Sequence, residues 1–380
     1  MDLNQTRQEI NTIDAQLAEL FKKRMNLALE VAKTKKKANL PVRNAAREKE
    51  ILHAVSEAVG EPLDGYARIL FNTLFDLSRS YQSNYLSGGS DLADRIKRAL
   101  DETPDLFPKK AVVACQGVEG AFSQAAAEKL FEVPGAMFFT SWEGVFNAVE
   151  KGLCQYGVLP IENSLLGSVG AVYDLMKHYN FHIVKSIRLR VAHSLLAKPG
   201  TRLKDVREIF SHEQAIGQCG AFLKSLGDVK ITICENTAGA AKAVADSGRA
   251  DIAAISSIDC ADIYGLESLK NNIQENDNNY TRFICISKNL EIYPGADKIS
   301  LVLSVPHKPS SLYRMIARFA ALGVNLTKLE SRPIPGSDFE FMFYFDMEAS
   351  VYMPELINLL SQLESQPDLF VFLGSYSEVI

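Results

Sequence analysis

Two cations near the start of the chain have a spacing that suits a small anion. Arg24 stands within a row of apolar residues at helical 3-4 spacing, where a hydrophobic residue is expected, so it would point inward. The row consists of Ile10, Ile13, Leu17, Leu20, Leu27 and Val31. Lys35 follows about 20° away in helical phase, on the same face. The two backbones would be about 16 Å apart, and a small dicarboxylate would fit between the two side chains.

A third cation, Arg7, cannot join this pair within one chain. Along the same helix it lies about 25 Å from Arg24 and about 42 Å from Lys35. An antiparallel partner helix would bring a second copy of Arg7 to the Arg24 and Lys35 end, so a shared site requires a dimer. The alternative is that Arg24 extends its charge to solvent and that residues 33–37 form a solvated charged face.

Further polar residues fall on two later helical segments. Arg47 and Glu48 closely follow Asn44 on the second segment. On the third, Ser78 and Gln82 end an i, i+4 row whose first members are apolar. These polar groups are expected to converge on one interior.

Polar segments also follow short apolar runs in the central part of the chain. After AVVAC (111–115) comes a glycine-bearing loop, 116–124, that would open a helix and present backbone N–H groups to an anion. The loop matches neither the GxGxxG nor the Walker pattern, so nucleotide binding is poorly supported. PIENS (160–164) follows another strand, at the kind of position where open α/β sheets bind ligands. Three later polar segments are SHEQAIGQC (211–219), NTAGAA (236–241) and NNYTRF (278–283).

The composition argues against several classes of protein. The 380 residues carry 41 Lys+Arg and 46 Asp+Glu, a net charge of −5, which disfavours a nucleic-acid binder. There is no run of about 18 apolar residues, and the first twenty positions are acidic and amphipathic, so we expect no membrane span, no signal peptide and a cytoplasmic protein. The cysteines lack CxxC spacing and nearby His pairs, which favours free buried thiols. They are Cys115, Cys154, Cys219, Cys234, Cys260 and Cys285.

The helical segments that would carry Arg7, Arg24, Lys35 and the polar residues beside them lie at the start of the chain. Residues 1–87 predict three amphipathic helices, namely one long helix followed by segments at about 43–58 and 64–86. Residues 88–109 predict a polar linker that continues the flexible composition of SGGS (87–90).

Two further domains are expected after the linker. Residues 110–290 alternate short apolar runs with helical stretches, which indicates an α/β domain. Residues 297–376 have the order βαββαβ, which is that of a small α+β, ferredoxin-like module. The chain is therefore expected to be a multidomain protein.

The helical part resembles the all-helical chorismate mutase family. The matching features are TRQEINTID, the spacing of Arg24 and Lys35, PVRNAAREKE and SRSYQ, which together cover nearly all of the first 86 residues. The resemblance implies a three-helix, domain-swapped dimer with shared sites where chorismate rearranges to prephenate. Arg7 from the partner chain and Arg24 would bind the two carboxylates, while Lys35 and Gln82 would face the ether oxygen. The other chorismate-binding positions are Asn44, Arg47, Glu48 and Ser78.

This chemistry needs no nucleophile, metal or proton shuttle. It depends on holding a flexible dianion in its reactive conformation and on placing cations at the breaking C–O bond. Glu48 would meet the substrate hydroxyl. Asn44 stands where relatives commonly have Asp, so it retains a polar group and removes one charge.

Residues 111–288 resemble prephenate dehydratases. The patterns GxxGxxS, PIENS, SHxQAxxQC, TAxAA and TRF occur in that order. The resemblance implies an α/β domain of two subdomains with a cleft between them, like a solute-binding protein. The chain would cross to the second subdomain near 190 and return to the first near 280. Thr281 would be catalytic and Arg282 would bind or orient a carboxylate. The other prephenate-binding residues would be Ser123, Asn163, Ser164, Gln214 and Phe283. His212 is interpreted either as a capping or buried structural residue or as a catalytic one.

The last module resembles the ACT regulatory domains of prephenate dehydratases. The resemblance rests on ALGVNLTKLESRPIPG (321–336), and it implies inhibition by L-phenylalanine bound between paired modules. Relatives usually have Gly-Ala-Leu where this chain has Ser310, Ser311 and Leu312, and a serine hinders the close backbone approach that glycine allows. The effector contacts would be Ser311, Leu312, Glu330, Ser331, Arg332 and Pro333.

The sequence thus predicts a bifunctional chorismate mutase and prephenate dehydratase of phenylalanine biosynthesis. No cofactor, metal, nucleic acid or membrane is implied, and the partners are chorismate, prephenate, L-phenylalanine and a second or further copy of the chain. Two alternatives stay open: a non-catalytic amino-acid sensor on the same scaffold, and a dehydratase whose mutase domain has decayed.

Overall fold

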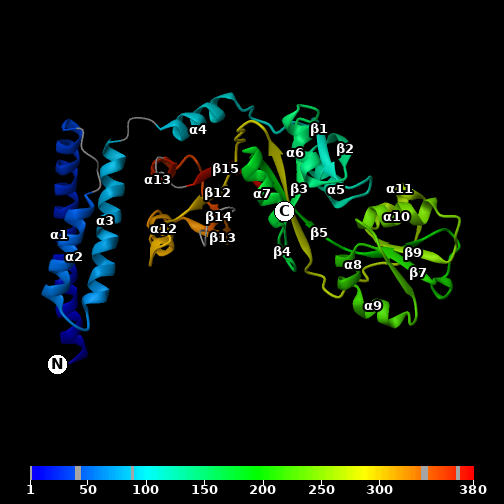
Figure 1. The fold of residues 1–380 in the computed structure, drawn as a ribbon, viewed down its shortest axis with the longest axis horizontal. Helices are drawn as coiled ribbons and strands as arrows, with labels where there is room; N and C mark the ends of the chain where they lie inside the picture. The colour runs from blue at the N-terminus through cyan, green and yellow to red at the C-terminus, as the bar shows by residue number, and fades with distance from the viewer. Residues whose placement is uncertain (1, 39–43, 87–89, 335–340, 365–368) are drawn as a thin grey trace. The chain divides into compact units, whose positions relative to one another are not determined.

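The computed structural model describes residues 2–38, 44–86, 90–334, 341–364 and 369–380. The chain forms two compact units (Figure 1). The first comprises Met1–Lys97 and Val302–Phe370, and the second comprises Arg98–Leu301 and Val371–Ile380.

Three helices begin the chain, as predicted. They are α1 (Leu3–Lys37), α2 (Ala45–Val59) and α3 (Asp64–Leu86). A capping box of Asp2 and Gln5 starts α1, and the side chain of Asn44 caps α2 by accepting a hydrogen bond from the Arg47 backbone N–H at 3.1 Å.

The apolar row of α1 is not buried within one chain. Its six members are 47–62% exposed, so the prediction of an inward-facing row is wrong for a single copy. The physical reason is that α1 contacts α3 through a different face, on which Ala32 is fully buried. Among the described residues of α1 to α3, Ala32 and Phe75 are the only buried apolar side chains, too few for a stable core.

The predicted linker contains a helix. α4 (Asp91–Glu102) lies within 88–109, and its Leu92, Ile96 and Ala99 are buried. Their i, i+4, i+7 spacing is a helical pattern that the many charges between them concealed. The Leu92 backbone N–H donates to Glu364 Oε2 at 2.9 Å, which ties the start of α4 to α13 (Pro354–Glu364). Residues 87–89 of the predicted flexible segment lie outside the described residues.

A mixed sheet, with both parallel and antiparallel strand pairs, forms the first half of the central α/β region. Its order is β16-β5-β11-β3-β1-β2, with β4 beside β3. The strands are β1 (Lys110–Gln116), β2 (Val133–Phe139), β3 (Tyr156–Asn163), β4 (Gly167–Ser168), β5 (His182–Arg190), β11 (Tyr280–Ser287) and β16 (Glu378–Val379). The helices are α5 (Phe122–Leu130), α6 (Trp142–Glu150) and α7 (Gly170–Tyr179).

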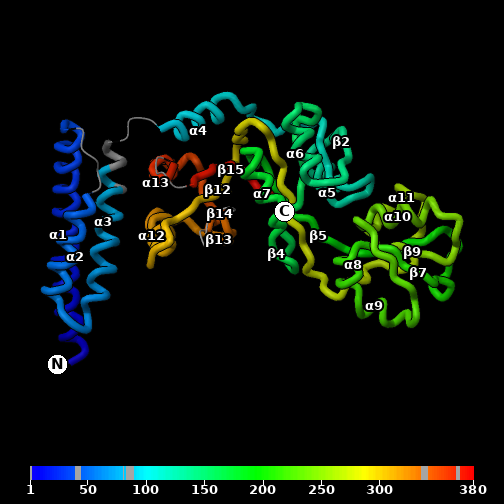
Figure 2. Tube along the Cα trace, in the orientation of Figure 1, coloured from blue at the N-terminus to red at the C-terminus, as the bar shows by residue number. Residues whose placement is uncertain are grey.

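A second sheet has the order β10-β6-β9-β7-β8. Its strands are β6 (Ser194–Ala197), β7 (Glu208–Ser211), β8 (Lys230–Ile233), β9 (Ile252–Ser256) and β10 (Glu267–Lys270). The helical segments are η1 (Leu203–Asp205), α8 (Glu213–Gln218), α9 (Gly220–Ser225), α10 (Thr237–Asp246) and α11 (Asp259–Tyr264). The chain leaves the first sheet after Arg190 and returns at Tyr280, which confirms the predicted crossings (Figure 2).

The first residue of β7, an inner strand of the second sheet, is a buried carboxylate held by cations. Glu208 accepts hydrogen bonds from Thr232 Oγ1 and pairs with Lys230, both at 2.7 Å, and it also pairs with Arg249. The donors, Lys230 first, lower the pKa of Glu208 to about 2.

Glu208→Gln is expected to lower the free energy of unfolding at neutral pH. Because the folded-state pKa is depressed, the stabilisation is present above the unfolded pKa of about 4.3 and is lost as the pH falls toward 2. Denaturant unfolding of the variant and wild type at several pH values measures this. A difference that stays constant from pH 7 to pH 2 would contradict the ion-pair explanation.

The last part of the chain has the predicted order βαββαβ. Its elements are β12 (Lys298–Ser304), α12 (Ser311–Ala320), β13 (Asn325–Pro333), β14 (Phe341–Glu348), α13 and β15 (Phe370–Tyr376). The sheet order is β13-β14-β12-β15. Residues 335 and 336 of the predicted signature lie outside the described residues.

The short strand β16, which the sequence did not reveal, returns the chain to the first α/β sheet. It pairs with β5, and Glu378 forms an ion pair with Arg188 at 2.8 Å. Val379 packs against the core that includes Ile187 and Phe283. The residues after the predicted boundary at 376 therefore complete the central domain.

Candidate functional site

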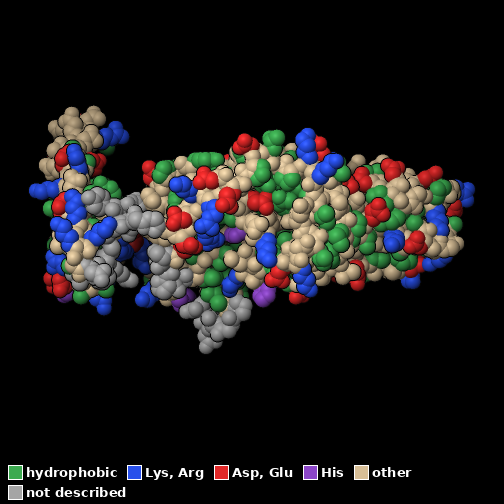
Figure 3. All heavy atoms as spheres, turned by 90° about the horizontal axis from the view of Figure 1, so that it is seen from above, with side chains coloured by type: hydrophobic (Ala, Val, Ile, Leu, Met, Phe, Trp, Pro, Cys, Tyr) green, Lys and Arg blue, Asp and Glu red, His purple; other side chains and the backbone are tan. Residues whose placement is uncertain are grey.

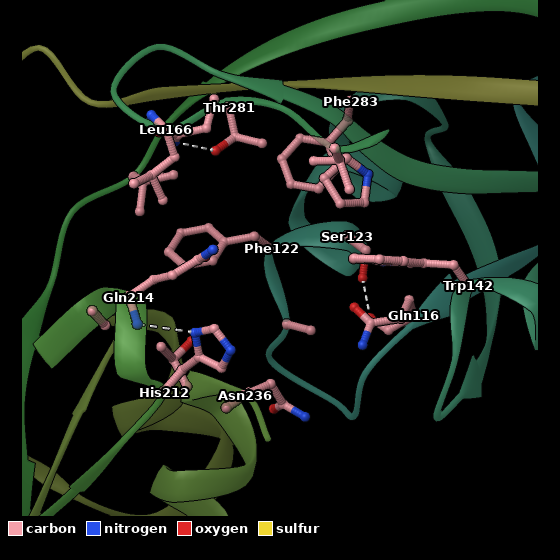
Figure 4. A pocket seen from close by; sticks show the side chains of 18 of the residues that line it. Gln116, Phe122, Ser123, Trp142, Leu166, His212, Gln214, Asn236, Thr281 and Phe283 are labelled. Atoms are coloured by element: carbon pink, nitrogen blue, oxygen red, sulfur yellow. Dashed lines mark hydrogen bonds between the residues drawn. The ribbon is translucent and has the colours of Figure 1, made fainter. Parts of the chain in front are cut away.

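A cavity of about 480 Å³ lies within the central α/β unit (Figure 4). Five of the predicted dehydratase residues line it, and they come from both subdomains. They are Ser123, Asn163, Gln214, Thr281 and Phe283. Apolar walls come from Phe122, Trp142 and Phe283, which suits a ring-shaped ligand.

Thr281 is buried, and its hydroxyl orientation follows from Asn163. The Asn163 Oδ1 accepts from the backbone N–H groups of Leu165 and Leu166, both at 3.0 Å. Its Nδ2 must then face the other way, and it donates to Thr281 Oγ1 at 2.9 Å. Because Thr281 Oγ1 already accepts a hydrogen bond, its own proton is directed elsewhere and can be donated to a ligand.

This hydrogen-bond network continues through three residues that sequence reasoning did not assign. Asn163 Nδ2 also donates to Asn279 Oδ1 at 2.8 Å, and Asn279 Nδ2 donates to Gln218 Oε1 at 2.9 Å. The same Gln218 oxygen lies 2.9 Å from His193 Nε2, which must therefore carry the proton. Burial lowers the pKa of His193, so its ring is neutral near pH 7. Asn279 lay within a quoted motif, whereas His193 carried no sequence signal.

Helix N-termini, rather than cations, supply the positive potential of the cavity. Residues in the first turns of α5, α7, α8 and α10 line it, and none of its described lining residues is Lys or Arg. Free backbone N–H groups and helix dipoles favour anions at such ends. Several converging N-termini are therefore suited to a ligand with carboxylates.

The loop 116–124 opens α5 as predicted. Gly120 has φ +85°, and a Cβ there would lie 2.7 Å from Cys260 Sγ, so only glycine fits. Ser123 Oγ donates to the Gln116 backbone carbonyl, which fixes it in the cavity wall (Figure 4). His212 caps α8, its Nδ1 accepting from the Gln214 backbone N–H at 3.3 Å, so its capping role is observed.

Two predicted prephenate-binding residues do not line the cavity. Side chains alternate along a strand, so Thr281 and Phe283 face the cavity while Arg282 faces away and pairs with Glu162 at 3.1 Å. Ser164 Oγ donates to the Asn278 carbonyl and accepts from the Tyr280 backbone N–H, both at 2.9 Å. Ser164 therefore fixes the backbone at the start of β11.

The helical unit brings together three of the predicted chorismate-binding residues. Arg24 donates to the Leu74 carbonyl at 3.2 Å and to Ser78 Oγ, so it faces α3. Burial lowers the pKa of Arg24 below the usual value of an arginine. One turn beyond Ser78, the buried Gln82 has an Oε1 atom without a hydrogen-bond partner in the described structure. Lys35 is half-buried on the same helix as Arg24.

The other predicted chorismate-binding residues make contacts of their own or are exposed. Arg7 is exposed, 17 residues before Arg24 on α1. Asn44 caps α2, and Arg47 forms an exposed ion pair with Glu50 at 2.9 Å. Glu48 pairs with Arg79 of α3.

Within the described parts of the chain, no group of three or more His, Cys, Asp or Glu residues is arranged to hold a metal. Among the same residues, no helix combines the length and apolarity needed to cross a bilayer. Burial raises the pKa of the Cys115 and Cys219 thiols to about 12, so these thiols are unreactive. Acidic and basic side chains are interspersed on the face drawn in Figure 3.

Two family models match the chain. The prephenate dehydratase model matches residues 113–291, and the chorismate mutase type II model matches residues 6–83. These ranges contain the cavity and the helical cluster respectively.

Individual relatives agree with both matches. Arogenate dehydratase/prephenate dehydratase 2 of Arabidopsis thaliana is 40% identical over 75% of this chain and 81% of its own. A bifunctional chorismate mutase/prephenate dehydratase of Aquifex aeolicus is 29% identical over 100% of this chain and 99% of its own. The structure of a prephenate dehydratase from Arthrobacter aurescens in complex with L-Phe has a TM-score of 0.63 and 27% identity, covering 70% of this chain and 89% of that one.

Proposed function

Because the chain belongs to the prephenate dehydratase family and also carries a chorismate mutase type II domain, we propose that its two sites catalyse consecutive reactions. The protein is a bifunctional enzyme. Its helical domain converts chorismate to prephenate, and its α/β domain converts prephenate to phenylpyruvate, CO₂ and water. The sensor alternative is set aside because both domains belong to enzyme families.

We assign the dehydratase reaction to the cavity around Thr281. Loss of CO₂ leaves an electron pair that forms the new ring double bond, while the C–O bond to the ring hydroxyl breaks. The departing hydroxide takes up one proton from solvent and becomes water. The Thr281 hydroxyl, oriented by Asn163, donates a hydrogen bond to the departing oxygen and stabilises its growing charge. This oriented donor is the observation that carries the assignment.

The carboxylates of prephenate would meet backbone N–H groups at the helix N-termini. Ser123 and Gln214 stand at the starts of α5 and α8 and add polar side chains there. Phe122, Trp142 and Phe283 would enclose the ring and exclude water, which strengthens each electrostatic contact.

Asn163→Asp tests the orientation of the Thr281 hydroxyl. The new carboxylate would accept the Thr281 proton instead of donating to its oxygen, and kcat for prephenate should fall by roughly a hundredfold. Ser164→Ala is the matched control, because Ser164 lies outside the cavity, and it should retain activity within a few-fold. Steady-state kinetics with prephenate checks both, and equal losses in the two variants would refute the assignment.

We assign chorismate binding to Arg24, Lys35 and Gln82, with Ser78 beside them. Arg24 and Ser78 are already in contact, and the unpartnered Gln82 oxygen can accept a hydrogen bond from a bound group or water. Asn44 lacks the charge that relatives commonly have at this position. The alternative of a dehydratase with a decayed mutase domain therefore stays open, and kinetics with chorismate test it.

The exposed row of α1 supports a dimer. A second copy would cover six half-exposed apolar side chains per chain, which contributes roughly 5–10 kcal/mol per chain. The same antiparallel arrangement would carry the partner's Arg7 to the Arg24 cluster. We therefore propose an obligate homodimer with shared mutase sites, and sedimentation equilibrium of the full chain tests it.

We propose that the βαββαβ module is an ACT domain of ferredoxin-like fold that binds L-phenylalanine. β13, which carries Glu330 to Pro333, is an edge strand of its sheet, and a second module could pair there. Glu330 and Arg332 lie on one face of β13, while Ser331 and Pro333 lie on the other.

Ser310 adopts a conformation that favours glycine. Its φ is +64°, in the left-handed region, at the N-cap of α12. Ser310→Gly should therefore relieve strain and tighten phenylalanine binding, with stronger inhibition of the dehydratase. Calorimetric titration measures the affinity, and weaker binding in the variant would contradict this explanation.

Arogenate is a second candidate substrate for the cavity. The Arabidopsis relative is named for it, and Glu235 is the one carboxylate among the described residues lining the cavity. A carboxylate repels a dianion such as prephenate but attracts the ammonium of the corresponding amino acid. Measuring kcat/KM for both substrates in the wild type and in Glu235→Gln tests this. The substitution should lower kcat/KM for arogenate but not for prephenate.

A further inference from the structure

Arg79 has no role in the sequence motifs or in the relatives' names, yet it lies next to Ser78 of the mutase cluster. Arg79 follows Ser78 on α3 and pairs with two carboxylates at once. Its Nη1 contacts Glu48 Oε1 of α2, and its Nη2 contacts Asp76 Oδ1 one turn earlier on α3. The three side chains are 29%, 22% and 18% exposed, so solvent screens these pairs only in part.

The location of this bridge connects it to substrate binding. Ser78, which precedes Arg79, accepts a hydrogen bond from Arg24, and Glu48 is the residue assigned to the chorismate hydroxyl. A carboxylate in a site that receives a dianion raises the energy of the bound state unless a cation neutralises it. Arg79 supplies that cation from the helix facing Glu48.

We propose that Arg79 is a positioning residue of the chorismate site: it holds the Glu48 carboxylate in the orientation that receives the substrate hydroxyl, and Asp76 holds Arg79. This inference rests on the proposed role of Glu48. The Arg79–Glu48 pair connects α3 with α2, as the contacts of Arg24 connect α1 with α3.

The geometry requires an arginine rather than any cation. Two different terminal nitrogens of one planar group contact two carboxylates on two helices. A lysine ammonium carries the same charge but no rigid fork, so it would retain neutralisation and lose orientation. Arg79→Lys therefore separates the effect of charge from the effect of position.

The test measures mutase kinetics of the full chain with chorismate. Arg79→Gln should raise KM about tenfold and change kcat less than threefold, because a contact made equally in the ground and transition states affects binding alone. Arg79→Lys should recover only part of that loss. Arg68→Gln, an exposed arginine earlier on α3, is the matched control and should leave KM unchanged.

Two further measurements exclude a general structural effect. Dehydratase activity on supplied prephenate should stay at the wild-type value in Arg79→Gln, and circular dichroism should show that the variant remains folded. In a Glu48→Gln background, Arg79→Gln should change KM less than twofold, because the residue acts through Glu48. Full additivity of the two substitutions, or complete recovery by Arg79→Lys, would overturn the positioning role.

The outcomes also distinguish this inference from the proposed function. If Glu48→Gln raises KM and Arg79→Gln does not, the inference about Arg79 is wrong and the assignment of Glu48 stands. If Glu48→Gln leaves KM unchanged, the assignment of Glu48 is wrong and the positioning role of Arg79 falls with it.

Discussion

Thr281→Val is expected to lower kcat for prephenate dehydration by about 10²–10³-fold. Valine has nearly the same shape as threonine, so the buried position in β11 remains filled and the fold is retained. The loss arises because Asn163 fixes the hydroxyl as a donor toward the cavity, and valine removes that donor. KM should change less than kcat, since the hydrogen bond strengthens mainly in the transition state.

Thr281→Ser is the matched control for this result. Serine keeps the oxygen that accepts from Asn163 and the proton that is donated, so most of the activity should return. A Thr281→Val variant with near-normal kcat would refute the role of the hydroxyl. So would a serine variant as inactive as the valine variant while remaining folded.

Arg24→Ala should abolish the mutase reaction and leave dehydratase activity on supplied prephenate largely intact. Removing a partly buried cation that pairs with a bound carboxylate costs about 3–5 kcal/mol, or roughly two to three decades in rate. Lys23→Ala, an exposed neighbour on α1, controls for a general effect of lost charge. Unchanged mutase turnover in Arg24→Ala would exclude the assigned site.

A mixture of variants tests whether the mutase site is shared. Arg7→Ala chains mixed with Arg24→Ala chains should regain partial activity, because a swapped heterodimer contains one site free of both substitutions. Verified heterodimers without any recovery would show that each site is built from one chain.

The sequence predicted the helices and most longer strands because local signals mark them. Pro62 and the capping residue Asn44 bracket α2, and the apolar runs at 111–115 and 281–287 coincide with β1 and β11. Helix α4 escaped prediction because charges surround its three buried residues. β16 escaped prediction because a strand of two residues is too short to show an alternation of apolar and polar residues.

The motifs indicated which segments form the site, but they did not indicate the directions of the side chains. Thr281 and Asn163, both within quoted motifs, lie in the cavity wall, whereas Arg282 lies outside it because strand alternation turns it toward Glu162. The connection from Asn163 through Asn279 and Gln218 to His193 is made of links that span 116, 61 and 25 positions. Such a network depends on side-chain directions that spacing in one sequence does not contain.

The most direct test of two separate consecutive sites is to follow chorismate, prephenate and phenylpyruvate together after adding chorismate to the purified wild type and to Thr281→Val. The wild type should consume chorismate and form phenylpyruvate. The variant should consume chorismate at the same rate and accumulate prephenate one for one. A wild type that leaves chorismate untouched, or a variant that stops consuming chorismate as well, would contradict the account.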